Sequence, residues 1–105
     1  MAGRSARRAA ASEGAPRRLA DLDGIGPAML GDLDRLGVRT VAALARREPR
    51  ALYDRLCDLT GQRQDPCVLD TFACAVAQAR DPRLPAAQRR WWWWSRKRLA
   101  ESARR

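Results

Sequence analysis

Residues 19–38 read LADLDGIGPAMLGDLDRLGV, and the organisation of the chain follows outward from this segment. Leu19 and Leu22 are three residues apart, so both lie on one face of a short helix. Gly24 and Gly26 come next, and glycine supports a tight turn because it lacks the Cβ atom that restricts other residues. Apolar residues then recur at helical spacing. The segment therefore predicts two short helices joined by a glycine turn.

The remaining helices are predicted from the residues that start and stop them. Pro27 suits the first position of the second helix, and Gly37 ends it. A third helix is expected to start after Thr40. A fourth is expected to start at Pro49 and end at Gly61, and a fifth to start at Pro66, after the N-cap Asp65, and end at about Arg80. No alternation of apolar and polar residues is long enough for a strand. The predicted fold class is all-α, a small five-helix bundle.

The chain is expected to divide into three parts. Residues 1–17 form a disordered basic arm, residues 18–94 form the folded domain with a Trp-rich C-terminal lid, and residues 95–105 form a basic, disordered tail. The positions expected in the core of the last two helices are Leu52, Tyr53, Leu56 and Leu59, then Val68, Leu69, Phe72, Val76 and Ala79.

The net charge of +9 is concentrated at the two ends of the chain. Residues 1–18 carry five arginines and one glutamate, and residues 80–105 carry nine basic and two acidic side chains. Residues 19–79 carry seven arginines and nine acidic side chains. Basic arms on a compact body attract phosphate through counterion release. Because arginine and alanine are both abundant, solvated tails without a partner are the alternative interpretation.

The glycine turn resembles the helix-hairpin-helix motif, in which backbone amides contact a phosphate. Without Cβ atoms at the two glycines, N–H groups lie open at the N-terminus of the second helix, where the helix dipole favours an anion. Ile25 is expected to point inward. Such contacts read no base edge. The predicted phosphate-binding residues are Gly24, Ile25, Gly26, Ala28, Arg35 and Arg39.

Two departures from that motif oppose DNA binding. Asp23 stands where the motif usually has proline, and Ala28 stands where DNA-binding members often carry lysine. A carboxylate opposes phosphate within a Debye length of about 8–10 Å. The alternative interpretation is that the hairpin serves only to connect two helices.

Four consecutive tryptophans, residues 91–94, lie between basic side chains. They cannot all face one core in a helix or a strand. The alternatives are stacking of unpaired bases on the indoles, contact with a membrane surface, and a lid over Leu69, Phe72 and Tyr53. The candidate contacts with nucleic acid or a partner protein are Trp92, Trp93, Arg96, Lys97 and Arg98.

The cysteines are Cys57, Cys67 and Cys74. The last two are seven residues apart on one helix, so their Cα atoms are about 10 Å apart. That spacing exceeds the disulfide limit of about 7 Å and disfavours a shared metal ion. We expect the cysteines to be buried small hydrophobes. Because Cys67 and Cys74 lie roughly opposite Phe72 on their helix, the alternatives for these two are contact with a second layer, such as the tryptophans, or with solvent. No metal site is predicted, although the three thiols are weak candidates for one.

Length and composition exclude several classes of protein. A chain of 105 residues suits one small domain. The absence of histidine excludes His-based catalysis and imidazole metal sites. No apolar run approaches the roughly 18 residues of a membrane span, and the N-terminal segment has no apolar signal region, so a cytoplasmic location is expected. No nucleophile is paired with a base, so neither an enzyme nor a cofactor is expected.

The segment from Leu19 to Trp94 resembles the bacterial pathogenicity-locus family of helix-hairpin-helix proteins. The matching stretches are DGIGPAMLGDLDRLGVRTVAAL, LYDRLCDLTG and DPCVLDTFACAVA, followed by the Trp cluster. All three cysteines fall on family positions, whereas Trp93 stands where the family usually has asparagine. Members are often labelled mitomycin resistance proteins. The resemblance therefore implies a link to DNA damage or mitomycin resistance, and it implies no catalytic residues.

The leading functional hypothesis is a non-enzymatic module that binds DNA independently of sequence through its phosphate backbone. The first alternative is a protein-interaction adaptor that uses exposed tryptophans and acidic helix faces. The second alternative is a thiol-based redox or metal sensor.

Overall fold

The structure is a computed structural model that describes residues 17–103, and every regular element in this range is a helix. The elements are η1 (Leu19–Asp21), α2 (Pro27–Arg35), α3 (Val41–Ala45), α4 (Pro49–Thr60), α5 (Pro66–Arg80), η2 (Ala86–Arg89) and α6 (Trp91–Ala103), where η marks a 3-10 helix. The all-α expectation is confirmed. The predicted arm over residues 1–17 lies almost entirely outside the described residues.

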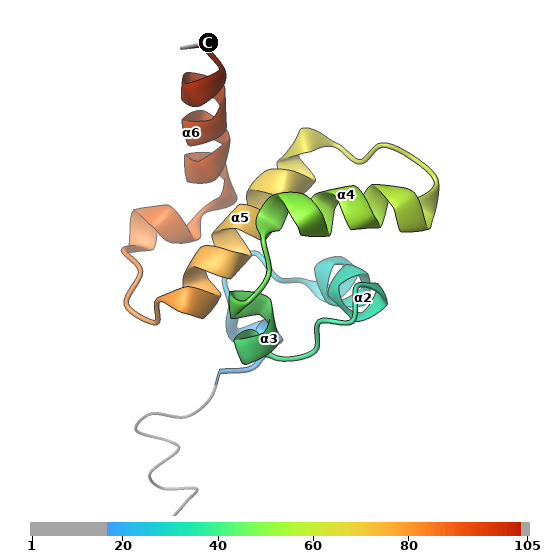
Figure 1. Cartoon of the computed structure of the whole chain (residues 1–105). Coiled ribbons are helices and arrows are strands. Elements are labelled where there is room, and N and C mark those ends of the chain that lie inside the picture. Colours follow the sequence, from blue (N-terminus) through green and yellow to red (C-terminus); the bar gives the residue numbers. More distant parts are fainter. Residues whose placement is uncertain (1–16, 104–105) are drawn as a thin grey trace, which may run out of the picture.

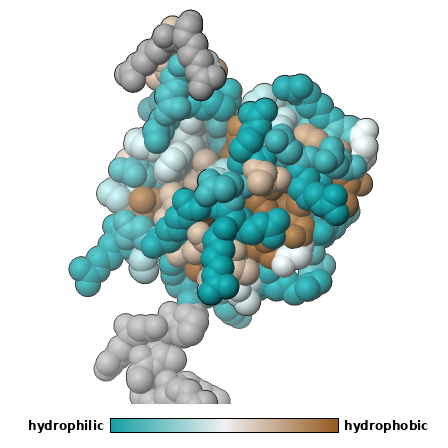
Figure 2. All heavy atoms as spheres, viewed as in Figure 1, coloured by the Kyte–Doolittle hydropathy of each residue, from teal (hydrophilic) through white to brown (hydrophobic). Residues whose placement is uncertain are grey.

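Helix α5 is the centre of the fold, because α3, α4, η2 and α6 all pack against it (Figure 1). Phe72 of α5 is completely buried, as are Leu33, Leu44 and Leu52 from the three preceding α-helices. Burial of these side chains supplies the main favourable free energy of folding. The view in Figure 2 shows a mostly hydrophilic face, with apolar side chains visible between the helices.

The predicted caps form as the sequence indicates. Thr40 Oγ1 accepts a hydrogen bond from the Ala43 N–H at 3.0 Å, and Asp65 Oδ1 accepts one from the Cys67 N–H at 2.8 Å. Gly61 ends α4 in the left-handed conformation with a φ of 69°. These local signals explain why the bounds of α3, α4 and α5 match their predictions closely.

The first expected helix is only one 3-10 turn, η1. Leu22 adopts an extended conformation with ψ of 142°, which ends the turn before an α-helix can form. Leu19 and Leu22 are nevertheless both buried, as their spacing predicted. The segment before the hairpin is therefore anchored by side-chain burial rather than by a regular helix.

The expectation of a disordered C-terminal tail is wrong for residues 95–103, which continue helix α6 from the tryptophans. Arg98 of this helix forms a two-pronged ion pair with Asp70 of α5, at 2.9 and 3.0 Å. Asp70 is only 2% exposed. This pairing across the fold, which no local pattern signals, fixes α6 against α5.

Burial also differs from the predicted stripes. Leu59 was expected in the core, but it is 44% exposed near the end of α4. Conversely, Asp70, Cys74 and Gln78 of α5 are buried although they lie off the predicted apolar face. The reason is that α5 is covered on several sides, so a single-face pattern underestimates its burial.

In the part of the chain that the structure describes, no helix has the length and apolar character needed to cross a membrane.

Candidate functional site

In the hairpin, which comprises residues 22–27, the two glycines adopt different backbone conformations. Gly24 has a positive φ of 84°, which favours glycine because a Cβ atom would be strained there. The next residue, Ile25, is 8% exposed and its N–H donates to the Leu22 carbonyl at 3.3 Å. The expectation that Ile25 points inward is confirmed, and its own amide is used by the turn.

Gly26 is the N-cap residue of α2, and its φ of −95° lies in the ordinary extended region. A Cβ atom placed at either Gly24 or Gly26 would meet no heavy atom within 4 Å. Both glycines are exposed. The outer side of the hairpin is therefore open space that a ligand can approach.

The first turn of α2 leaves backbone donors unused. Pro27 has no N–H, and no side chain caps the helix. Within residues 17–103, the N–H groups of Gly24, Gly26, Ala28 and Met29 donate to no acceptor. Amides at a helix N-terminus and the positive end of the helix dipole together favour an anion. The arrangement can hold a phosphate oxygen.

Gln78 of α5 fixes the position of the hairpin. Its side-chain Oε1 accepts a hydrogen bond from the Asp23 N–H, and its Nε2 donates to the Asp23 carbonyl, each at 2.9 Å. Gln78 is 3% exposed, so both bonds are shielded from water. Sequence reasoning missed this residue, because its partner lies 55 positions away.

The charges beside the hairpin differ from those predicted. Arg89 of η2 places its Nε atom 3.3 Å from Asp23 Oδ2, which offsets the acidic residue next to Gly24. This geometry is not that of a hydrogen bond, so the Nε–H finds no acceptor in the described chain. Arg89 was not among the predicted residues, and its contact with Asp23 gives the hairpin a nearby cation.

Arg35 and Arg39 are not brought to the hairpin. Arg35 is the last residue of α2, about 12 Å along the helix from its first residue at 1.5 Å per residue. It lies 3.9 Å from Asp32, and Arg39 lies 2.9 Å from Asp34. Both guanidinium groups are thus balanced by carboxylates near the far end of the helix.

The four tryptophans open helix α6 and divide between two environments. Trp91 and Trp92 are 38% and 44% exposed, whereas Trp93 and Trp94 are half-buried. Trp94 Nε1 donates to the Gln88 carbonyl at 2.8 Å. The cluster is therefore only partly a cover for the bundle.

The basic residues of α6 also have different roles. Arg98, a predicted contact, is held by the buried Asp70, and this hydrogen bond raises the pKa of the guanidinium. The Lys97 ammonium lies 5.2 Å from the Trp94 ring centre and 3.9 Å from Glu101. Arg96 is exposed. Among these three, Arg96 has the side chain best placed to meet a partner.

The cysteines are free and lie in three environments. Cys67 is exposed, contrary to the expectation of burial, and its hydrogen bond with Asp65 raises the pKa of the thiol. Burial raises the pKa of Cys74 to about 11, so this thiol stays protonated at neutral pH. Cys57 is half-buried. No set of three potential metal-binding side chains gathers within residues 17–103.

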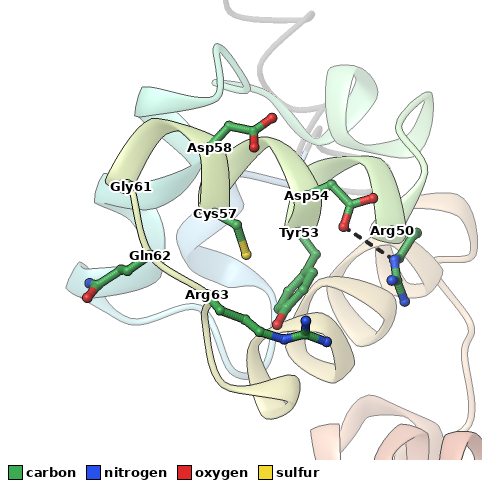
Figure 3. Close-up of a pocket in the computed structure, with 8 residues that line it drawn as sticks. All are labelled: Arg50, Tyr53, Asp54, Cys57, Asp58, Gly61, Gln62 and Arg63. Atoms are coloured by element: carbon green, nitrogen blue, oxygen red, sulfur yellow. Dashed lines mark ion pairs between the residues drawn. The ribbon is translucent and has the colours of Figure 1, made fainter.

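A concave region with a volume of about 530 Å³ lies along α4 and the loop that follows it (Figure 3). The Cys57 thiol points into it, and Arg50 pairs with Asp54 at 3.3 Å on its rim. Its lining carries two arginines and two aspartates, and this balance of charge does not favour one ligand class. The lining residues are Arg50, Tyr53, Asp54, Cys57, Asp58, Gly61, Gln62 and Arg63.

Comparison with known proteins identifies a sequence family whose match includes the hairpin. A sequence model described as Pathogenicity locus matches residues 12–100. The mitomycin resistance protein McrB of Streptomyces lavendulae is 42% identical over 81 residues, which are 77% of this chain and 75% of that protein. No solved structure matches the chain at a significant level.

Proposed function

This chain belongs to the pathogenicity-locus family, and on that premise we propose that it is a non-enzymatic DNA-binding protein that contacts the phosphate backbone. One observation carries the proposal: backbone donors at the N-terminus of α2 are unused, and the two neighbouring glycines have open space where a side chain would stand. A helix N-terminus of this kind attracts phosphate through directed N–H groups and the helix dipole.

The contact proposed is with one phosphate group of the DNA backbone. The N–H groups of Gly26, Ala28 and Met29 donate to its oxygens, while Gln78 keeps the hairpin in place through Asp23. Phosphate contacts position a protein on DNA without reading bases. Binding is therefore expected to be independent of sequence.

Arg89 is proposed to assist the hairpin in place of Arg35 and Arg39. Its guanidinium lies beside Asp23 and offsets the carboxylate that would otherwise repel a phosphate. The basic residues that flank the domain add long-range attraction.

The curated relative is named a mitomycin resistance protein, and we extend that association to this chain. In this proposal the protein contributes to resistance by occupying DNA rather than by chemical modification of a substrate.

The test is DNA binding by the full-length chain, measured by fluorescence anisotropy with a short labelled duplex at low salt. Gly26→Glu places a carboxylate at the open hairpin, so it is expected to weaken binding at least tenfold. Gly26→Ala adds only a methyl group into open space and is the control, with a change below about threefold. Equal affinities for the Glu and Ala variants would overturn the proposal.

A matched pair of arginine variants tests the electrostatic part. Arg89→Gln is expected to weaken binding more than Arg35→Gln, because only Arg89 lies beside the hairpin. The opposite order would move the phosphate contact to the far end of α2. Binding of a protein partner by Gly26→Glu, without any DNA binding by the wild type, would instead indicate an adaptor.

A further inference from the structure

The N-terminal end of α6 presents two large aromatic rings to solvent. Trp91 and Trp92 are 38% and 44% exposed, and their ring centres lie 6.0 Å apart in an edge-to-face arrangement. Neither indole N–H finds an acceptor within residues 17–103, whereas Trp94 Nε1 donates to Gln88. Two adjacent exposed rings offer apolar surface to a flat ligand, and their indole N–H groups are accessible to water or to that ligand.

The helix that carries the rings is anchored to the rest of the fold. Trp94 is fixed by its hydrogen bond to Gln88, and Arg98 is fixed by the buried Asp70 one turn further on. Trp92 and Leu99 are seven residues apart, so they share the helix face turned away from these anchors. A preorganised ring loses little conformational entropy when a ligand stacks on it.

A cation lies over one of the two rings, and the residue before it contacts the hairpin. The Arg90 guanidinium lies 5.8 Å from the Trp92 ring centre. The preceding residue, Arg89, lies beside Asp23 of the hairpin. Two arginines that are consecutive in the sequence therefore contact the hairpin and the exposed aromatic rings.

We propose that Trp91 and Trp92 form a stacking platform, in which one of the two nearly perpendicular rings stacks on an unpaired DNA base. This inference rests on the proposed function and makes it more specific: single-stranded or locally unpaired DNA is the preferred ligand. Flat aromatic rings flanked by cations suit a base with its attached phosphate. A second copy of the chain suits the platform poorly, because a symmetric contact there would gather Arg90 and Arg96 of both copies at one interface, where like charges repel.

The test compares three labelled ligands of equal length with the full-length chain: single-stranded oligothymidine, an abasic oligomer, and a blunt duplex. Wild type is expected to bind oligothymidine about 5- to 100-fold more tightly than the abasic oligomer, which has the same phosphates without bases. Equal affinities for these two ligands would overturn the platform.

Variants at Trp92 separate stacking from folding. Trp92→Leu is expected to lose about 5- to 100-fold in affinity for oligothymidine and to keep its affinity for the duplex. Trp92→Phe retains an aromatic ring and should keep most of the affinity. Leu99→Ala removes exposed apolar surface from the same face and is the control, with less than a twofold change. Equal losses for Trp92→Leu and Trp92→Phe would contradict stacking.

Variants of the hairpin and of the platform are expected to affect different ligands. Gly26→Glu weakens binding of every ligand if the hairpin holds phosphate, whereas Trp92→Leu weakens only oligothymidine. If only Gly26→Glu weakens binding, the platform is rejected and the proposed phosphate contact at the hairpin is kept. If only Trp92→Leu weakens binding, the phosphate contact at the hairpin is rejected and base stacking on the tryptophans is kept. A wild-type dimer that Trp92→Leu dissociates, or wild-type binding to anionic phospholipid vesicles that it abolishes, would assign the platform to another occupant.

Discussion

At Gly24 the backbone has a positive φ of 84°, whereas Gly26 has a φ of −95° that any residue adopts. Gly24→Ala is therefore expected to destabilise the protein by about 1–2 kcal/mol, because a side chain is disfavoured in the left-handed region. Gly26→Ala is expected to cost less, below about 1 kcal/mol, because it loses only the preference for glycine over alanine at a helix N-cap. Urea denaturation measures both, and similar losses at the two positions would contradict this description of the turn.

Because of Cys74, the free energy of unfolding is expected to depend on pH in the alkaline range. Burial raises the pKa of its thiol to about 11 from an ordinary value of 9.0. Between these two pH values the unfolded chain ionises Cys74 while the folded chain does not, so unfolding releases a proton and stability falls as pH rises. Below pH 9 the full stability is present.

The measurement is the free energy of unfolding of wild type and Cys74→Ala at pH 8 and pH 11, under reducing conditions. Relative to the alanine variant, the wild type is expected to lose about 1–2 kcal/mol over this interval. Parallel pH profiles for the two proteins would show that Cys74 ionises equally in both states.

The ion pair between Asp70 and Arg98 decides whether α6 stays on α5. Arg98→Met is expected to lower the free energy of unfolding by about 3 kcal/mol, because it leaves a buried carboxylate without a partner. This value is at the low end for buried ion pairs because the Arg98 side chain is 31% exposed. Adding Asp70→Leu should recover most of that loss. Urea denaturation of the single and double variants checks both values, and a single variant as stable as wild type would refute the role of the pair.

At the level of helices, the sequence predicts what local chemistry determines. Thr40, Asp65 and Gly61 fix helix ends through contacts within a few residues, and these ends appear where expected. The helical continuation through residues 95–103 was not predicted, because it depends on Asp70, 28 positions before Arg98. From the sequence alone, a charged residue in a helix is predicted to face solvent, because its partner in another helix is not known.

The candidate site shows the same division. Glycines two apart before a proline predict an open helix N-terminus, because the missing Cβ atoms and the missing N–H are properties of those residues. Gln78 and Arg89 join the site only through the packing of α5 and η2 against the hairpin. Proximity in sequence instead suggested Arg35, which lies at the opposite end of α2.

For the whole molecule, the distribution of charge predicts salt-dependent binding. If about three to five phosphates are neutralised, a plot of log K against log salt has a slope of about −3 to −5. Deleting residues 1–16, which carry three arginines and one glutamate, should make the slope less steep. Anisotropy titrations at several salt concentrations measure it, and affinity that does not respond to salt would contradict phosphate contacts.

The direct test of the hairpin is a titration of isotope-labelled full-length protein with short DNA, followed by backbone amide NMR shifts. The amides of Gly26, Ala28 and Met29 are expected to shift to saturation, and by more than those of Arg35 and Arg39. If these three amides stay unchanged while signals elsewhere shift and DNA is bound, the hairpin does not hold the phosphate.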